Sequence, residues 1–171
     1  YKRQVVSLPE PQGPRIEREV NDDVKYIDYL PLYTQKAACG KFGEWQQAEE
    51  EGWIKTEGMG KLTSGMFIIQ ANGHSMEPRI MDGDFCVFRA NIVGSRIGKI
   101  VLVQHPEHYD FENGGSYSIK KYSSEKKQDP ETGEWMHERI ILYPLNPDYQ
   151  PIEIRNEEGF IVVGEFIGIV K

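Results

Sequence analysis

From residue 66 onward, short apolar runs alternate with turn-forming residues, and this pattern limits the fold more than any other feature of the chain. The runs are rich in Ile, Val, Phe and Tyr, which favour strands. The expected strands are Met66–Ala71, Phe85–Arg89, Lys99–Gln104, Tyr117–Tyr122, Glu138–Tyr143, Pro151–Ile154 and Phe160–Val170, with a break at Gly164. The pattern predicts a mostly β fold, a complex of β-sheets with a barrel-like core over residues 66–171.

The chain before this region has a different character. Residues 1–33 begin with Pro9, Pro11 and Pro14 and a charged run, which predict an N-terminal arm or linker that ends in one strand or an extended packing segment. In residues 34–65, the small residues and two glycines of Ala37–Gly43 predict an extended, accessible loop. Helix formers over Glu44–Gly52 favour a short helix after it.

Composition excludes several classes of protein. The 171 residues suit one domain with appendages, and 20 Lys and Arg against 27 Asp and Glu give a net charge of −7, which argues against DNA binding as the main role. No apolar run approaches the roughly 18–20 residues of a membrane span, and residues 1–30 lack the apolar stretch of a signal peptide. Two cysteines, Cys39 and Cys86, favour a reducing, cytoplasmic setting. The scattered histidines indicate no metal, and no cofactor is expected.

The segment Asn72–Asp84 places glycine, serine and proline directly after an apolar strand. Gly73 permits a tight turn and Pro78 ends any helix, so this turn is suited to present the Ser75 hydroxyl beside backbone N–H groups that bind an oxyanion. Serine between glycine and proline is also an ordinary loop residue. A nucleophile and a structural turn are therefore both open on these residues alone.

A serine nucleophile needs a base, and the chain offers histidine or lysine. There is no G-x-S-x-G sequence, and exposed or locally bonded side chains are favoured for the four histidines, His74, His105, His108 and His137. Lys120 lies among apolar positions of an expected strand, where burial disfavours its charged form and lets it accept a proton near neutral pH. The alternative is an ordinary charge that protects a strand edge.

Four stretches, in this order, resemble the LexA/UmuD-type self-cleaving peptidases, the S24 family: Gly73–Pro78, Asp82–Asp84, Ser118–Tyr122 and Leu145–Ile152. The resemblance covers about residues 34–171. It implies a LexA C-terminal-like fold, which is similar to that of signal peptidases. It also implies that Ser75 is the nucleophile and that Lys120, rather than Lys121, is the base.

The same resemblance implies a cleavage site. The family cuts its own chain upstream of the serine, at a bond between a small residue and glycine, and Cys39–Gly40 matches this pattern. A small side chain fits a tight pocket, and glycine lets the backbone come close to the nucleophile. The backbone N–H groups of His74 and Ser75 are the expected oxyanion donors.

The family also suggests partners. Its cleavage loop moves in cis between a distant and a docked position, and a RecA filament on single-stranded DNA favours docking as part of the SOS response to DNA damage. The last strand, Phe166–Val170, is the expected homodimer interface. No membrane partner is implied.

Two departures from the family indicate a divergent branch. Residues 1–33 are too short and too rich in proline for the helix-turn-helix domain of LexA, and they are closer to the short arm of UmuD. The loop Val103–Gly115 is longer than the family's turn, and Glu125–Glu138 forms an additional charged hairpin. This suggests a peptidase domain of a larger protein, such as a DNA-processing enzyme, in which self-cleavage is a release switch.

Two other functions remain open. One is a catalytically silent dimerisation or binding module of the same fold that acts with DNA-repair or polymerase partners. The other is a signal-peptidase-like enzyme, against which the lack of a membrane anchor argues. The geometry of Ser75 and Lys120 distinguishes catalysis from a silent module, because a base must lie within hydrogen-bond reach of the proton that it takes.

Overall fold

The computed structural model describes residues 7–9, 13–42 and 48–171, and its strands form one sheet. The elements are β1 (Ile16–Glu17), η1 (Asp22–Val24), β2 (Tyr29–Tyr33), α1 (Gln35–Phe42), β3 (Gly52–Lys55), β4 (Met66–Gln70), β5 (Phe85–Arg89), β6 (Ile100–Gln104), β7 (Tyr117–Gln128), β8 (Trp135–Tyr143), β9 (Ile152–Ile154) and β10 (Ile161–Val170). The strand order is β1-β3-β2-β4-β5-β10-β6-β7-β8-β9. The mostly β fold is confirmed, and the described strands do not close into a barrel, because β1 and β9 remain at the two ends of the sheet.

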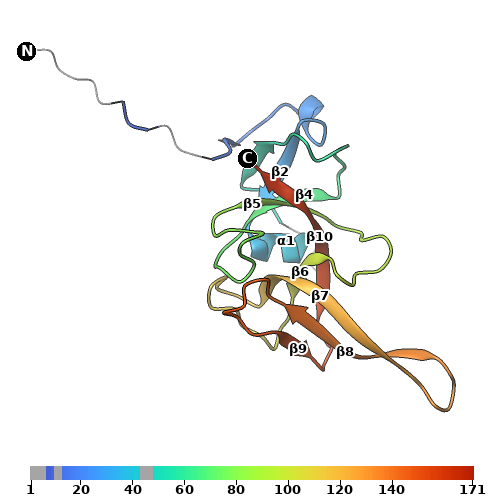
Figure 1. Cartoon of the computed structure of the whole chain (residues 1–171). Helices are drawn as coiled ribbons and strands as arrows, with labels where there is room; N and C mark the ends of the chain where they lie inside the picture. The colour runs from blue at the N-terminus through green and yellow to red at the C-terminus, as the bar shows by residue number, and fades with distance from the viewer. Residues whose placement is uncertain (1–6, 10–12, 43–47) are drawn as a thin grey trace, which may run out of the picture.

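Strand β10 connects the two parts of the sheet, since it pairs with β5 on one side and with β6 on the other. Figure 1 shows it running between the upper strands and the lower hairpin strands. The expected break at Gly164 is wrong, because β10 runs without interruption from Ile161 to Val170 and only its pairing with β6 shifts register between Val162 and Gly164. A Cβ at Gly164 would lie 3.0 Å from the carbonyl oxygen of Arg89, so the close approach of β5 favours glycine here.

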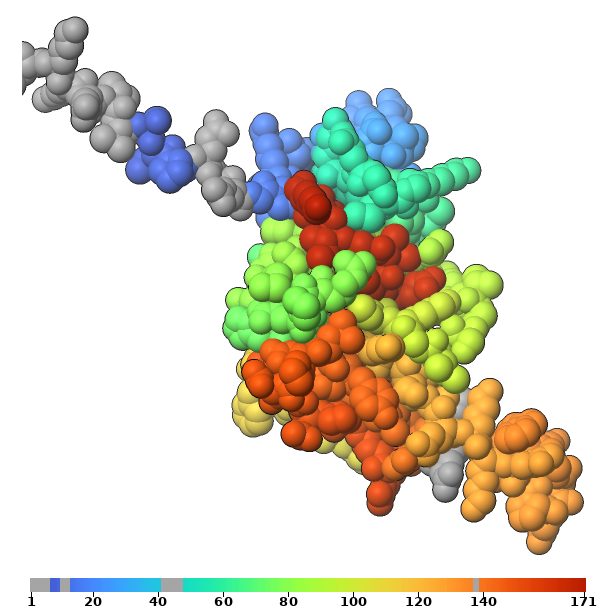
Figure 2. Space-filling model, in the orientation of Figure 1, coloured from blue at the N-terminus to red at the C-terminus, as the bar shows by residue number. Residues whose placement is uncertain are grey.

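Strands β7 and β8 are longer than the sequence pattern predicts. They continue past the apolar residues as the predicted charged hairpin, which projects from the body in Figures 1 and 2. Pairing between Lys127 and Met136, near its tip, is regular. Backbone hydrogen bonding thus extends these strands where the apolar alternation has already stopped.

A buried apolar cluster lies beneath the Ser75 turn. Phe67 of β4 and Phe88 of β5 are both 0% exposed, and their rings stack at 5.9 Å. The same cluster contains Met76, which follows Ser75, and Ile119, which precedes Lys120. The hydrophobic core therefore holds the backbone on both sides of the candidate site.

The prediction of an extended loop over Ala37–Gly43 is wrong, because residues 35–42 form the helix α1. Thr34 accepts a hydrogen bond at its hydroxyl from the N–H of Ala37, at 3.0 Å, and so caps the helix. Alanine is the strongest helix former, and the paired alanines outweigh Gly40. Gly43 and residues 44–47 of the predicted short helix lie outside the described residues, and residues 48–50 are not helical. Neither helix in the described ranges is long and apolar enough to cross a membrane.

Candidate active site

The turn that carries Ser75 is held by the Asp-Gly-Asp segment. Gly73 adopts a φ of +86°, and its N–H donates to Oδ1 of Asp82 at 2.8 Å. Asp84 accepts the N–H of Met81 at 2.8 Å on its carboxylate, and its carbonyl accepts the N–H of Ala71 at the same distance. The Asp82–Asp84 stretch, which resembles the family, is thus the scaffold that fixes the turn carrying the serine.

A second support comes from the stretch that follows β8. The backbone N–H groups of Leu145 and Asn146 both donate to the carbonyl of Ser75 at 3.0 Å. The side-chain amide of Asn146 donates to the carbonyl of His74, also at 3.0 Å. The Leu145–Ile152 stretch was singled out by resemblance, and the structure assigns it this bracing role.

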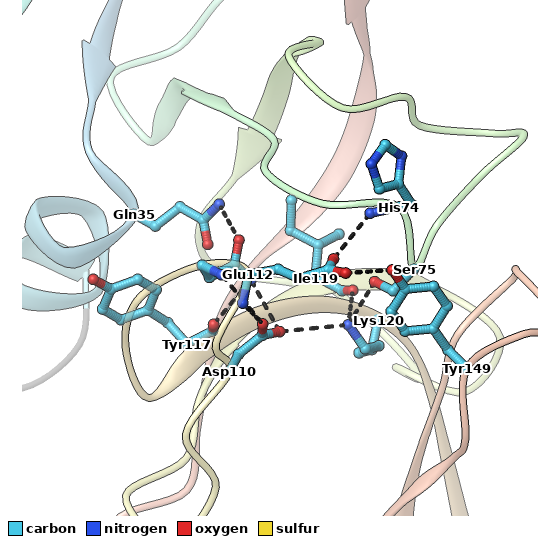
Figure 3. A network of polar contacts seen from close by, with 10 residues as sticks. Gln35, His74, Ser75, Asp110, Glu112, Tyr117, Ile119, Lys120 and Tyr149 are labelled. Atoms are coloured by element: carbon cyan, nitrogen blue, oxygen red, sulfur yellow. Dashed lines mark hydrogen bonds and ion pairs between the residues drawn. The ribbon is translucent and has the colours of Figure 1, made fainter.

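Lys120 on β7 points toward Ser75. Its Nζ lies 2.8 Å from Oγ of Ser75 and 3.1 Å from the carbonyl oxygen of Ile119 (Figure 3). The alternation of the strand buries Lys120, which is 4% exposed, and turns Lys121 to the solvent. The two residues singled out as nucleophile and base are thus within hydrogen-bond distance of each other.

Burial and the neighbouring carboxylates shift the pKa of Lys120 in opposite directions. Burial lowers its pKa, because water is lost from the charged form, and the carboxylates of Asp110 and Glu112 partly offset this lowering. Oδ2 of Asp110 lies 4.0 Å from Nζ. Lys120 therefore loses its proton more readily than a solvated lysine does, which suits a general base.

Asp110 also organises the long loop between β6 and β7. Its Oδ1 accepts the N–H groups of Glu112 and Asn113 at 3.0 and 3.2 Å. Asn113 in turn donates to Oδ2 of Asp110, at 3.1 Å, and accepts at its Oδ1 from the Gln35 side chain of α1, also at 3.1 Å. The loop insertion thus contributes to the site and is tied to α1.

Glu112 covers one of the expected oxyanion donors. Its Oε2 accepts the N–H of His74 at 3.0 Å, and its Oε1 accepts the hydroxyl of Tyr149 (Figure 3). Sequence reasoning gave no role in the site to Asp110, Glu112 or Tyr149. The signal for the two carboxylates was the unusual length of their loop, and Tyr149 lies in the Leu145–Ile152 stretch that resembles the family.

The expected scissile residues, Cys39 and Gly40, lie within α1 rather than on an open loop. Cys39 is 1% exposed, and burial raises the pKa of its thiol to about 12. It packs in the same core cluster as Met76 and Ile119, and α1 contacts β7. Cys86 is a buried core residue of β5, as expected, and both cysteines are free.

His74 and His105 lie in different environments. His74 is exposed, and its Nδ1 lies 2.5 Å from Oε1 of Glu77, which raises the pKa of the imidazole. His105 is buried, contrary to expectation, because its ring packs on Phe160 at 6.0 Å. Burial lowers its pKa. The side chain of His137 is not among those described.

Comparison with known proteins gives a consistent result. The profile of the Peptidase S24-like family matches residues 31–129, a range that includes Ser75 and Lys120. The LexA repressor of Geobacter metallireducens is 27% identical over 123 residues, which cover 71% of this chain and 51% of that protein. The chain thus spans about half the length of this curated relative. Because the family profile extends over more than half of its residues, this chain belongs to the Peptidase S24-like family.

Proposed function

We propose that this chain is a self-cleaving serine peptidase, with Ser75 as nucleophile, Lys120 as base and Cys39–Gly40 as the bond that is cut. The observation that carries the proposal is the 2.8 Å contact between Nζ of Lys120 and Oγ of Ser75 in a site where the lysine side chain is 5% exposed. A buried lysine with a lowered pKa is the kind of base that a Ser–Lys pair requires. Membership of a peptidase family supports the same reading.

The steps follow from these positions. Neutral Lys120 takes the hydroxyl proton as Oγ of Ser75 bonds to the carbonyl carbon of Cys39, and backbone N–H groups at His74 and Ser75 stabilise the oxyanion. The bond from carbon to the Gly40 nitrogen then breaks, and Lys120 returns the proton to that amine. Water hydrolyses the resulting ester and releases Ser75. Because the substrate is part of the same chain, the attack is intramolecular.

Cleavage requires a change in α1. Cys39 is packed in the core, so its carbonyl becomes accessible to Ser75 only when the helix opens. The helix already contacts the strand that carries Lys120, and the displacement needed is therefore local. We propose this opening, rather than the long swing of an extended loop, as the docking step in this chain.

The test is self-cleavage of the whole chain at pH 7 and at about pH 10, where lysine side chains lose their protons. The parent is compared with Ser75→Ala, Lys120→Ala and the matched control Lys121→Ala, and the products are read by intact mass. Fragments 1–39 and 40–171 are expected from the parent and from the control, more rapidly at high pH, and from neither dyad variant. Equal cleavage by the Ser75→Ala chain would refute the proposal.

A role in a cytoplasmic DNA-damage response, with cleavage as a release switch, is the wider proposal. Its support is the similarity to a LexA repressor. Adding RecA, an ATP analogue and single-stranded DNA to the same assay tests it, with acceleration by the complete filament only as the expected result. An unchanged rate of self-cleavage would show that the RecA filament does not activate this chain.

A silent dimerisation or binding module is the second candidate. The observation in its favour is that Glu112 occupies the N–H of His74, which the reaction needs. Failure of the parent to cleave or to react at Ser75 under any of these conditions, with self-association or partner binding intact, would support it.

A further inference from the structure

We infer that Glu112 is an internal latch, whose carboxylate sits where the carbonyl oxygen of the substrate must bind and keeps the site from reacting until it is displaced. The inference deepens the proposed function and rests on it. It concerns the regulation of the same Ser75 and Lys120 site by the long loop between β6 and β7.

The carboxylate is held from two sides. Oε2 accepts the N–H of His74 at 3.0 Å, and Oε1 accepts the hydroxyl of Tyr149 from the stretch that braces Ser75. An N–H group engaged by a carboxylate is not available to a developing oxyanion. Figure 3 shows the Glu112 carboxylate linked by dashed lines to His74 and to Tyr149.

Gly73 leaves the space that Glu112 fills. A Cβ at this position would collide with the Glu112 carboxylate, and the φ of +86° independently favours glycine. Gly73 therefore has two roles: it allows the turn, and it leaves room for the Glu112 carboxylate beside the backbone. Glu112 is itself exposed, so its two hydrogen bonds, rather than burial, hold the carboxylate at this position.

The latch also carries a charge of the wrong sign for the reaction. A second negative group near a forming oxyanion raises the energy of the intermediate. Glu112 further favours the ammonium form of Lys120, in the same sense as Asp110. The Glu112 carboxylate thus opposes acylation of Ser75 in two ways, by engaging the N–H of His74 and by its negative charge.

The loop couples the latch to the cleavage segment. Asp110 and Asn113 hold the backbone around Glu112, and Asn113 accepts a hydrogen bond from Gln35 at the start of α1. Opening of α1 removes this tether. Displacement of Glu112 and release of Cys39–Gly40 are therefore expected to occur in one conformational change.

The latch is tested with an alkyl fluorophosphonate, which needs the oxyanion donors but not the cleavage segment. Oγ of Ser75 bonds to phosphorus, fluoride leaves, Lys120 takes the hydroxyl proton, and the phosphoryl oxygen faces the N–H groups. Adduct formation on the whole chain is followed by intact mass at about pH 10, where the charge of lysine contributes least to differences between variants. The Ser75→Ala chain sets the background.

Glu112→Ala is expected to label at least about tenfold faster than the parent, because one oxyanion donor is worth about 10² to 10³ in rate. Tyr149→Phe, which removes one hydroxyl and keeps the ring, is expected to give a smaller increase in the same direction. Glu107→Ala is the matched control, since this carboxylate lies on the same loop but accepts its hydrogen bond from the Asn156 side chain rather than from His74 or Tyr149.

The outcomes separate the two proposals. Parent-like labelling of the Glu112→Ala and Tyr149→Phe chains, above the Ser75→Ala background, would overturn the latch and leave the Ser75 nucleophile in place. An equal increase in the Glu107→Ala chain would overturn it too, by showing that a looser loop suffices. Absence of Ser75-dependent labelling in every chain would overturn the proposed function, and the latch with it.

Discussion

Asp110 and Lys120 face each other inside the site, with Oδ2 of the aspartate 4.0 Å from Nζ of the lysine and with side chains 16% and 5% exposed. This carboxylate stabilises the ammonium form, whereas burial destabilises it and prevails. The balance between the two determines the pH at which Lys120 becomes a base. The first prediction follows from it.

Asp110→Asn is expected to move the rise of the cleavage rate to lower pH. The amide keeps the size of the side chain but removes the charge that raises the pKa of Lys120, so a larger fraction of the lysine is neutral at any given pH. A shift of the whole profile toward lower pH, with a higher rate near pH 7 than in the parent, is the expected result. The measurement is self-cleavage, followed by intact mass, across the pH range.

Asp129→Asn is the control for this profile. Asp129 accepts a backbone N–H from Glu131, as Asp110 accepts backbone N–H groups in its own loop. It lies in the β7–β8 hairpin, which projects from the body of the fold (Figure 1). Its profile should match that of the parent. A profile unchanged by Asp110→Asn would show that this carboxylate does not set the pKa of Lys120.

Asn146→Ala is expected to slow cleavage more than it destabilises the fold. The change removes the 3.0 Å hydrogen bond to the carbonyl of His74 and the one that Asn146 accepts from the N–H of Asp148, while the backbone bonds to Ser75 remain. A loss of about 1 kcal/mol in stability and about tenfold in rate is expected, because a small displacement of the nucleophile weakens its alignment. Single-turnover cleavage and urea unfolding are measured together, with Asn156→Ala as the exposed control. Loss of stability without loss of rate would contradict the positioning role.

Phe88→Ala is expected to destabilise the chain by about 3–5 kcal/mol, because it leaves a cavity beneath the site. Phe88 is 0% exposed, and the centroid of its ring lies 5.9 Å from the ring centroids of both Phe67 and Phe166. Val93→Ala, at a position 85% exposed, should change the free energy of unfolding by less than about 0.5 kcal/mol. Urea titrations give both values, and similar values for the two variants would refute this description of the core.

Gln35→Ala is expected to expose Cys39 more often. The side chain of Gln35 donates to the carbonyl of Gln70 at 3.3 Å and to Asn113 at 3.1 Å, and its loss should raise the labelling of Cys39 by a thiol reagent about fivefold. Cys86 is an internal control, because it is equally buried but lies on β5. Peptide masses distinguish the two thiols. Equal acceleration at both would indicate global unfolding rather than opening of α1.

Local sequence pattern accounts for much of the sheet. Phe85–Arg89 is a strand with the predicted bounds, because the apolar side chains of neighbouring residues are enough to indicate it. Gly164 does not break β10, but the pairing of this strand with β6 shifts register there. Ser75 and Lys120, named by resemblance, lie within 2.8 Å of each other.

The sequence by itself therefore determined the β-rich fold, the family and the pair of residues on which the proposal depends. Only the tertiary structure decided that Cys39 and Gly40 are helical, because the Thr34 cap and burial against the core act together there. It alone brought Glu112 onto His74 and Asp110 toward Lys120. These contacts join residues far apart in the chain, and their distances depend on how the long loop packs across the folded sheet, which no local pattern encodes.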